Sequence, residues 1–236
     1  MPASNPYGLQ GVEVEYSEEH WRLLREKRRK AAMVMRALQP LQAEIIVHGS
    51  VARGDVREDS DIDVVVVNPV QPSLIELALE KRGLRPFKRV IVQATPLYVP
   101  KVYFILDPEE EMVVSTPLAP LRPREREFYK WGGELDLKGV LSGKRVPGVN
   151  KELVLIIPTE RGHMEVEIQG IEGLVARILG VSIETVMERV KVLTRRREKG
   201  HTGLYLEVEV PPGVPVEEVL RELRWRDKLF RRRSGL

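Results

Sequence analysis

The chain has 236 residues, 42% of them hydrophobic and 31% charged, with a formal net charge of +3. This length suffices for one large or two small domains with a buried core. The absence of cysteine excludes disulfides and zinc–thiolate sites, and no apolar run or signal-peptide pattern indicates a membrane or secreted protein. We therefore expect a cytoplasmic protein. Its many charged residues and few Asn and Gln are typical of proteins from hot environments.

The first predicted element is a long helix that follows an irregular arm, residues 1–16. Ser17 is its expected N-cap, and Pro40 ends it after Gln39. One face of the helix is apolar and carries Trp21, Leu24, Met35 and Leu38. The other face is basic and carries Arg22, Arg25, Lys27, Arg28, Arg29 and Lys30. We expect this basic face to be solvated, and the alternative is contact with nucleic acid.

A short apolar strand, 44–48, leads into a Gly-Ser pair. Gly49 permits a tight turn and a close backbone approach. Residues 50–54 are predicted to start a short helix, whose free N–H groups suit an anionic phosphate. The turn therefore predicts a phosphate cradle.

Two carboxylates follow on the next predicted strand, 61–67. Asp61 and Asp63 are two residues apart, so an extended strand presents both on one face. Paired carboxylates repel each other unless a divalent cation lies between them, and Mg²⁺ prefers such hard oxygen ligands. A metal-binding pair after a phosphate cradle indicates phosphoryl or nucleotidyl transfer.

These residues resemble the signature of the DNA polymerase beta-type nucleotidyltransferase superfamily. The sequence of residues 49–54, Gly-Ser-Val-Ala-Arg-Gly, is similar to that of its minimal archaeal and bacterial members. The signature is Gly49-Ser50, ten intervening residues, and Asp61-Ile62-Asp63-Val64. The resemblance implies an α/β (α+β) fold with a mixed sheet flanked by helices. It implies catalytic Asp61 and Asp63 that bind Mg²⁺ or Mn²⁺, and a nucleotide held by Gly49, Ser50 and Arg53. For Arg53, a place on the helix surface is an equally good interpretation.

The superfamily also has a third carboxylate on a neighbouring strand, and this chain departs from that pattern. The strand after the next helix reads Arg89-Val90-Ile91-Val92-Gln93, and Gln93 is the position that we align with the acid. An amide binds metal weakly and does not deprotonate a hydroxyl. The candidate substitutes are Glu165 and Glu167, which share one strand face, then Asp107 and Asp136.

The remaining pattern predicts a helix at 73–83, strands at 88–94 and 101–106, a short helix near 124–130, and strands at 152–157 and 163–169. A Pro-rich stretch, 116–123, indicates a boundary. We expect a nucleotidyltransferase core with its N-terminal helix at 1–122, and a smaller α+β region at 123–236.

A second constellation lies in the C-terminal half. Ala176, Gly180 and Val186 have the spacing of a helix-turn-helix, and Ser182 caps its second helix. The segment resembles the DNA-binding helices of Lrp/AsnC-type winged-helix regulators. In that case Glu184, Thr185, Glu188 and Arg189 face the groove, and residues 195–203 with strand 204–210 form a basic wing. The alternatives are a structural hairpin and a holder for RNA or another large acceptor.

Two functions are compatible with these patterns. The first is an Mg²⁺-dependent nucleotidyltransferase that uses a nucleoside triphosphate and an acceptor hydroxyl on RNA, protein or a small molecule. The second is a catalytically weak, nucleotide-binding regulator that contacts nucleic acid through the winged-helix-like segment. Gln93 favours the regulator, whereas the intact pair of Asp61 and Asp63 favours the enzyme.

Overall fold

A computed structural model describes residues 6–200 and 203–235. The chain divides into two compact units built from interleaved segments. Unit 1 consists of Met1–Arg29, Val47–Ser60 and Pro123–Thr202, and unit 2 of Lys30–Ile46, Asp61–Arg122 and Gly203–Leu236. The expected boundary before Pro123 is one of the points where the chain passes from one unit to the other.

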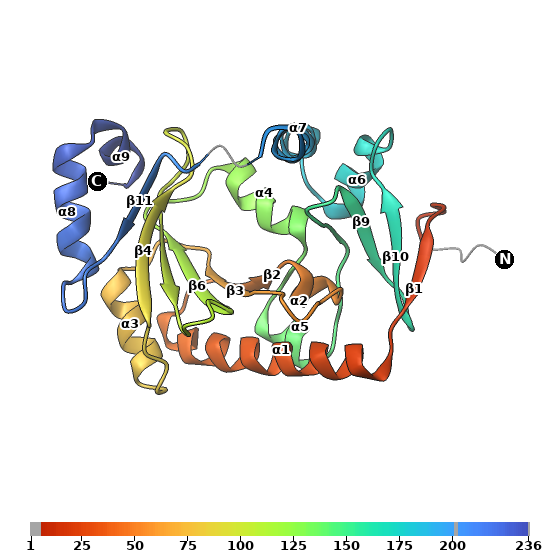
Figure 1. Cartoon of the computed structure of the whole chain (residues 1–236), viewed down its shortest axis with the longest axis horizontal. Helices are drawn as coiled ribbons and strands as arrows, with labels where there is room; N and C mark the ends of the chain where they lie inside the picture. The colour runs from red at the N-terminus through yellow and green to blue at the C-terminus, as the bar shows by residue number, and fades with distance from the viewer. Residues whose placement is uncertain (1–5, 201–202, 236) are drawn as a thin grey trace. The chain divides into compact units, whose positions relative to one another are not determined.

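Unit 2 is built on a mixed sheet. Its strands follow the order β11 (Leu206–Glu209), β4 (Lys88–Gln93), β5 (Lys101–Ile105), β6 (Met112–Pro117), β3 (Ile62–Val66) and β2 (Ile45–His48). Strands β11 to β6 pair antiparallel, whereas β3 pairs parallel to β6. The β3–β6 crossover is possible because the intervening chain contains α3 (Pro72–Glu80), β4 and β5. Figure 1 shows β11 beside β4.

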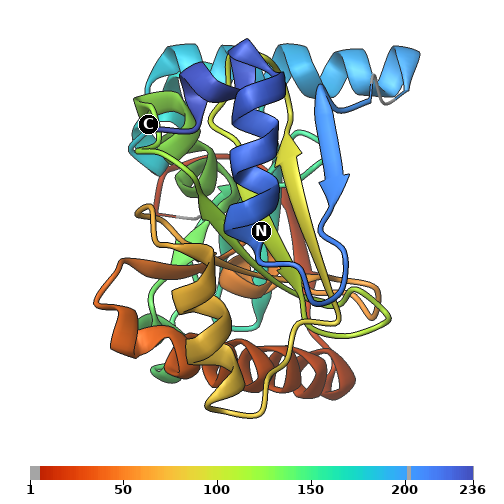
Figure 2. The same cartoon turned by 90° about the vertical axis from the view of Figure 1, so that its left-hand side faces the viewer.

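Helices cover this sheet. They are the second part of α1 (Glu18–Leu38), η1 (Gln39–Leu41), α3, α8 (Val216–Arg226) and α9 (Lys228–Arg233). The core contains fully buried Ile62, Phe104 and Val114. Arg89 fastens the loop before α8, because its guanidinium donates to Pro211 O at 2.8 Å and to Val214 O at 3.1 Å. In Figure 2, α8 faces the viewer.

Unit 1 contains a smaller antiparallel sheet. Its strand order is β1 (Val12–Glu15), β10 (Gly162–Glu167), β9 (Val154–Pro158) and β8 (Gly148–Val149). Its core packs against α6 (Glu172–Leu179) and α7 (Ile183–Lys199) through residues such as Leu155, Val175 and Val186. The unit also contains α2 (Ser50–Arg53), α4 (Pro123–Gly132), β7 (Glu134–Leu135) and α5 (Leu137–Leu141). β7 pairs with the end of β2, at Val47 and His48.

The expected α/β class is confirmed, and so is the long N-terminal helix. Ser17 Oγ accepts a hydrogen bond from His20 N at 3.2 Å, which caps α1 as its sequence predicts. The helix ends at Leu38, and Pro40 follows in η1. No helix in the described part of the chain is long and apolar enough to cross a membrane.

Four strands were not predicted, namely β1, β6, β7 and β8. β1 lies in the segment expected to be an irregular arm, and it pairs with β10 at the sheet edge. β6 lies partly inside the Pro-rich stretch that was interpreted as a boundary. β1 and β6 are short, and each pairs with a strand distant in sequence, β10 and β3 respectively, which local sequence patterns do not reveal.

The helix-turn-helix hairpin forms, but the predicted wing is wrong. Gly180 ends α6 with φ of 61°, and Ser182 Oγ accepts from Thr185 N. Arg195 to Lys199 are the last turn of α7, not a wing. The strand expected to complete the wing is β11, which pairs with β4 in unit 2. Of the predicted wing, His201 and Thr202 lie outside the described residues.

The helix face expected to enter a DNA groove packs against α4 instead. Thr185 is buried and its hydroxyl donates to Glu127. The Arg189 guanidinium lies 4.8 Å from the centre of the Phe128 ring, and Glu188 accepts from Arg124 at 3.3 Å. Of the four predicted groove residues, only Glu184 has no such contact with α4 among the interactions described. The hairpin therefore serves the core of unit 1.

Candidate functional site

The two carboxylates lie in unit 2, at the start of β3. Asp61 immediately precedes the strand and is exposed, whereas Asp63 is half-buried within it. Ile62 and Val64 alternate with them and are almost completely buried. Because side chains alternate between the faces of a strand, Asp61 and Asp63 share the face opposite to Ile62 and Val64, on which Val65 further along the strand is buried. This placement agrees with the motif.

β6, one of the two neighbours of β3 in the sheet, carries no carboxylate at its four paired positions. Val113 of β6 is the direct partner of Asp63, and Ser115 is the partner of Val65. Cross-strand partners point to the same face of a sheet, so Val113 and Ser115 stand beside the pair. The β6 position next to Asp63 is therefore aliphatic in this chain.

The alignment of Gln93 with the third acid is wrong. β4 is separated from β3 by β5 and β6. Ile91 pairs with Val102 of β5, and Val102 pairs with Thr116 of β6. Thr116 and Val114 share one face of β6, and Val114 pairs with Val64, so Ile91 lies on the sheet face opposite to Asp63. Gln93 lies on that opposite face because it is two residues from Ile91. It is fully buried, and its Nε2 donates to Tyr98 O at 3.0 Å.

The other candidate acids have local roles. Asp107 accepts from the backbone N of Glu111 and of Met112, at 2.9 and 2.7 Å, and closes the turn before β6. Asp136 caps α5 by accepting from Gly139 N at 2.7 Å. Glu165 Oε1 lies 3.2 Å from His163 Nε2 in unit 1, and Glu167 on the same strand face is exposed.

Within the described ranges, no three His, Cys, Asp or Glu side chains gather as a metal ligand set. A carboxylate next in register to Asp61, that of Glu111, lies 2.6 Å from Lys30 Nζ.

The Gly-Ser turn lies in unit 1. Gly49 has φ of 81° and ψ of −146°, and its N donates to Gly133 O at 2.9 Å. Its carbonyl accepts from Ala52 N and Arg53 N, both at 3.0 Å, and so begins the four-residue helix α2. This combination of angles is open almost only to glycine. The turn therefore depends on Gly49.

We expect Gly49→Val to abolish nucleotide binding in a protein that still folds. A Cβ at Gly49 would meet no atom within 4 Å, so the cost is backbone strain, of about 1–3 kcal/mol. Relief of that strain would turn the N–H groups of the turn away from their present directions. Calorimetric titration with nucleotide and urea unfolding measure the two effects. Gly173→Ala, which has open space and an ordinary φ, is the control. Unchanged affinity in folded Gly49→Val would mean that the turn is only structural.

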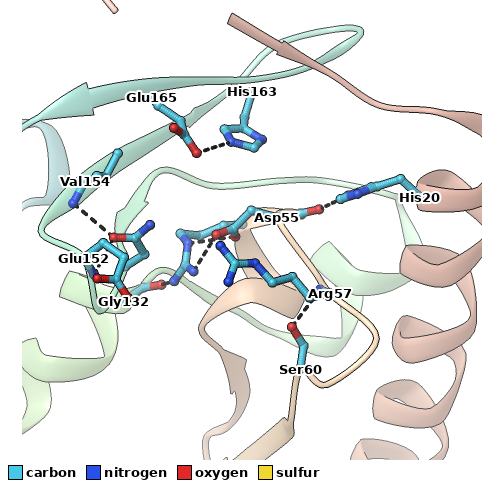
Figure 3. A network of polar contacts seen from close by, with 12 residues as sticks. His20, Asp55, Arg57, Ser60, Gly132, Glu152, Val154, His163 and Glu165 are labelled. Atoms are coloured by element: carbon cyan, nitrogen blue, oxygen red, sulfur yellow. Dashed lines mark hydrogen bonds and ion pairs between the residues drawn. The ribbon is translucent and has the colours of Figure 1, made fainter. Parts of the chain in front are cut away.

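Arg53 is held by the protein itself. Its side chain is 7% exposed, and Nε and Nη2 donate to the two Asp55 oxygens at 3.0 and 2.8 Å. Nη1 donates to Gly132 O at 2.6 Å. Figure 3 shows Asp55 and Gly132 in this network. These contacts favour a role in holding α2, while direct contact with a phosphate stays a prediction.

Two cations of α1 that were expected on a solvated face are buried. Lys27 Nζ donates to Glu58 O at 3.0 Å and to Ser60 O at 2.6 Å. Arg28 donates from Nε to Val51 O at 3.0 Å and from Nη2 to Ala52 O at 3.1 Å. Burial, and then the charge of Arg145, lower the pKa of Arg28 to about 10, so it stays protonated at neutral pH.

Lys27 and Arg28 therefore hold two parts of the motif in unit 1. Arg28 fixes the end of α2, and Lys27 fixes the loop whose last residue, Ser60, is bonded to Asp61. Figure 3 shows the same loop closed by Arg57 N donating to Ser60 Oγ at 2.8 Å. The roles of Lys27 and Arg28 were not predicted, because the sequence of the basic run on α1 does not distinguish buried cations from solvated ones.

An aromatic and histidine cluster also supports the C-terminal end of α2. His20 Nε2 lies 2.8 Å from the carbonyl oxygen of Gly54, the residue that ends α2 (Figure 3). His20 stacks on Tyr16, with ring centroids 3.6 Å apart, and the Tyr16 hydroxyl lies 2.7 Å from His163 Nδ1. Burial, followed by the nearby Asp55 carboxylate, raises the pKa of Tyr16. Its phenol therefore stays protonated at neutral pH.

The aspartate pair of β3 and the glycine turn that precedes it in the sequence are the two parts of the nucleotidyltransferase-like motif. Comparison with known families agrees. Residues 28–118 match the family model of the nucleotidyltransferase domain. This stretch contains the Gly-Ser turn, α2 and both aspartates, and it supports the nucleotidyltransferase superfamily with general nucleoside monophosphate transfer. No curated protein matches the chain.

Proposed function

We propose that the protein transfers a nucleoside monophosphate from a nucleoside triphosphate to an acceptor hydroxyl. The observation that carries the proposal is the pair of Asp61 and Asp63 on one face of β3, inside a segment that matches the nucleotidyltransferase domain. Asp61 and Asp63 act as the catalytic and metal-binding residues. The backbone at Gly49 and the hydroxyl of Ser50 hold the terminal phosphates.

The carboxylate pair fits a divalent ion. Asp61 and Asp63 supply two hard oxygen ligands, and Mg²⁺ commonly takes one or two carboxylates together with water and phosphate oxygens. A third carboxylate beside Asp63 is not required for such a set. When bound, Mg²⁺ or Mn²⁺ supplies charge that stabilises the departing pyrophosphate. The two aspartates hold that charge in place, and Gly49 and Ser50 orient the leaving phosphates.

Val113 favours a second candidate function. It lies at the β6 position beside Asp63 and does not take a proton from an attacking hydroxyl, as an acid at that position would. A chain of this kind binds nucleotide but transfers it slowly, which suits a regulator that senses nucleotide. This candidate does not include nucleic-acid contact through a wing, because the end of α7 and strand β11 do not form a wing.

The enzyme needs an acceptor for the nucleotide, whereas the regulator does not. We propose that residues 1–122 provide nucleotide transfer, with nucleoside triphosphate as the donor, and that residues 123–236 select the acceptor. The acceptor is a hydroxyl of RNA, of a protein or of a small molecule. Its identity follows from the assay described next.

Incubation with Mg²⁺ and each α-labelled nucleoside triphosphate tests the proposal. Cellular RNA, DNA, protein and small-molecule fractions serve as acceptors. We expect one fraction to become labelled while an equal amount of pyrophosphate is released, and chelation of the metal to stop both. Nucleotide binding without pyrophosphate release from any fraction would contradict the enzyme and support the regulator.

A further inference from the structure

A strongly basic run lies on the C-terminal helices α8 and α9. Residues 221–233 contain seven Lys and Arg against two acids, a net charge of +5, whereas the whole chain has +3. The other 223 residues therefore sum to −2. Five of these cations are exposed on α8 and α9, namely Arg221, Arg226, Lys228, Arg231 and Arg232. This concentration attracts anions, even though the net charge of the chain is small.

Among these cations stands an exposed tryptophan. Trp225 is 84% exposed, the highest value among the large hydrophobic side chains described. Tryptophan is usually largely buried, because its ring is the largest apolar side chain. It follows Arg221 by four residues on α8, so both side chains share one helix face. Figure 2 shows α8 on the side of unit 2 that faces the viewer.

A second aromatic ring lies at the same end of α8. Tyr205 is 38% exposed, and its hydroxyl lies 2.8 Å from Asp227 Oδ2, two residues beyond Trp225. Asp227 also caps α9, because its Oδ1 accepts from Leu229 N at 2.8 Å and from Phe230 N at 3.0 Å. Both acids of the segment have partners in it, since Glu222 pairs with Arg226 at 3.8 Å. Asp227 therefore organises the junction, and its charge is already included in the net charge of +5.

The helices that present these side chains are anchored. Phe230 of α9 is fully buried. Arg224 of α8 donates to Ser234 Oγ and to Ser234 O, both at 3.0 Å. Ser73 N donates to Glu217 at 2.8 Å and fixes the start of α8 to α3. Trp225 and the exposed cations thus project from helices that are already held in place. Ligand binding therefore costs little conformational entropy of the backbone.

We propose that α8 and α9 bind single-stranded nucleic acid, with a base stacked on Trp225 and phosphates beside the exposed cations. An aromatic ring within a basic surface is the combination that single strands require, because each nucleotide offers a π-face and a negative charge. A bilayer is less well matched, since only Trp225 and Leu229 are large exposed apolar side chains on these two helices. The surface is separate from the Asp61–Asp63 pair in sequence, and the proposal does not depend on nucleotide transfer.

The test measures binding of fluorescein-labelled dT20 and U20 by anisotropy at low salt, together with tryptophan fluorescence. We expect Trp225→Ala to weaken binding roughly tenfold, the loss of about one stacked base. Trp225→Phe should restore much of the affinity, which a charge effect alone does not explain. Asp61→Asn/Asp63→Asn should bind the oligonucleotides as the wild type does, so failure of the transfer reaction leaves this test intact.

A matched pair of triple variants isolates the charge. Lys228→Ala/Arg231→Ala/Arg232→Ala should weaken binding and flatten the log–log salt slope by roughly two units, at about 0.7 for each phosphate contact of a single strand. Arg195→Ala/Arg196→Ala/Arg197→Ala removes the same charge from the exposed end of α7 and should change much less. Equal losses in both triples would overturn the proposal. It would also be overturned by the absence of salt-sensitive binding in the wild type, by Trp225-dependent binding only to phosphatidylserine vesicles, or by a Trp225-dependent dimer in sedimentation.

Discussion

Replacing Asp61 and Asp63 by asparagine should lower nucleotidyl transfer more than about 100-fold and remove the metal dependence of nucleotide binding. An amide has the shape of the carboxylate but not its charge, so it does not hold a divalent ion against water. Asp61 is exposed and Asp63 is half-buried, on the face opposite to buried Ile62 and Val64, so the fold should survive. Pyrophosphate release gives the rate, and calorimetry with and without Mg²⁺ gives the binding.

The chain contains a matched control for this substitution. Glu207 and Glu209 have the same two-residue spacing, on the edge strand β11, and both are exposed. Glu207→Gln/Glu209→Gln removes two charges from unit 2 without touching the motif, and we expect wild-type transfer and binding. If nucleotide binding by the Asp61/Asp63 variant kept its dependence on Mg²⁺, the assignment of the metal-binding pair would be wrong.

Lys27→Met should destabilise the protein by about 2 kcal/mol and slow transfer by roughly 100-fold. Lys27 is only 2% exposed, and its ammonium donates to the carbonyls of Glu58 and Ser60. Methionine fills most of the volume but leaves both carbonyls without this donor. The loop then relaxes, and with it Asp61, the residue after Ser60. A shift of about 1 Å in a metal-binding residue is enough for a loss of this size.

Lys30→Met on the same helix is the control for Lys27→Met. Lys30 also bonds an acceptor at 2.6 Å, the Glu111 carboxylate, but its side chain is 30% exposed. Exposed ion pairs contribute about 0–1 kcal/mol, so Lys30→Met should have a small effect on stability. Urea unfolding separates stability from activity, which is measured well below the unfolding midpoint. A Lys27→Met protein with wild-type transfer would show that the loop needs no such support.

The carboxylate pair and the glycine turn were both predictable from sequence, because each depends on local geometry. Alternation along one strand places Asp61 and Asp63 on one face, and only glycine suits the angles of Gly49. The cap of α1 at Ser17 is equally local. These features involve residues within a few positions of each other, so the chain determines them before any long-range contact forms.

The neighbour of Asp63 was decided only by the tertiary structure. Sequence order suggested β4, and hence Gln93, but β6 inserts beside β3 and brings Val113 there. The strand order in a sheet is a choice among segments far apart in the chain, and two-residue alternation is the same in every strand. The same reason explains the error over the wing, since the strand after α7 pairs with β4.

The sequence by itself thus determined the class of motif, its spacing and the faces of individual elements. The tertiary structure alone decided which cations of α1 are buried, with Lys27 and Arg28 holding backbone carbonyls while Lys30 pairs at the surface. Burial of a charge depends on what packs over it, and that is set by segments distant in the chain. Local periodicity carries the first kind of information, and long-range packing carries the second.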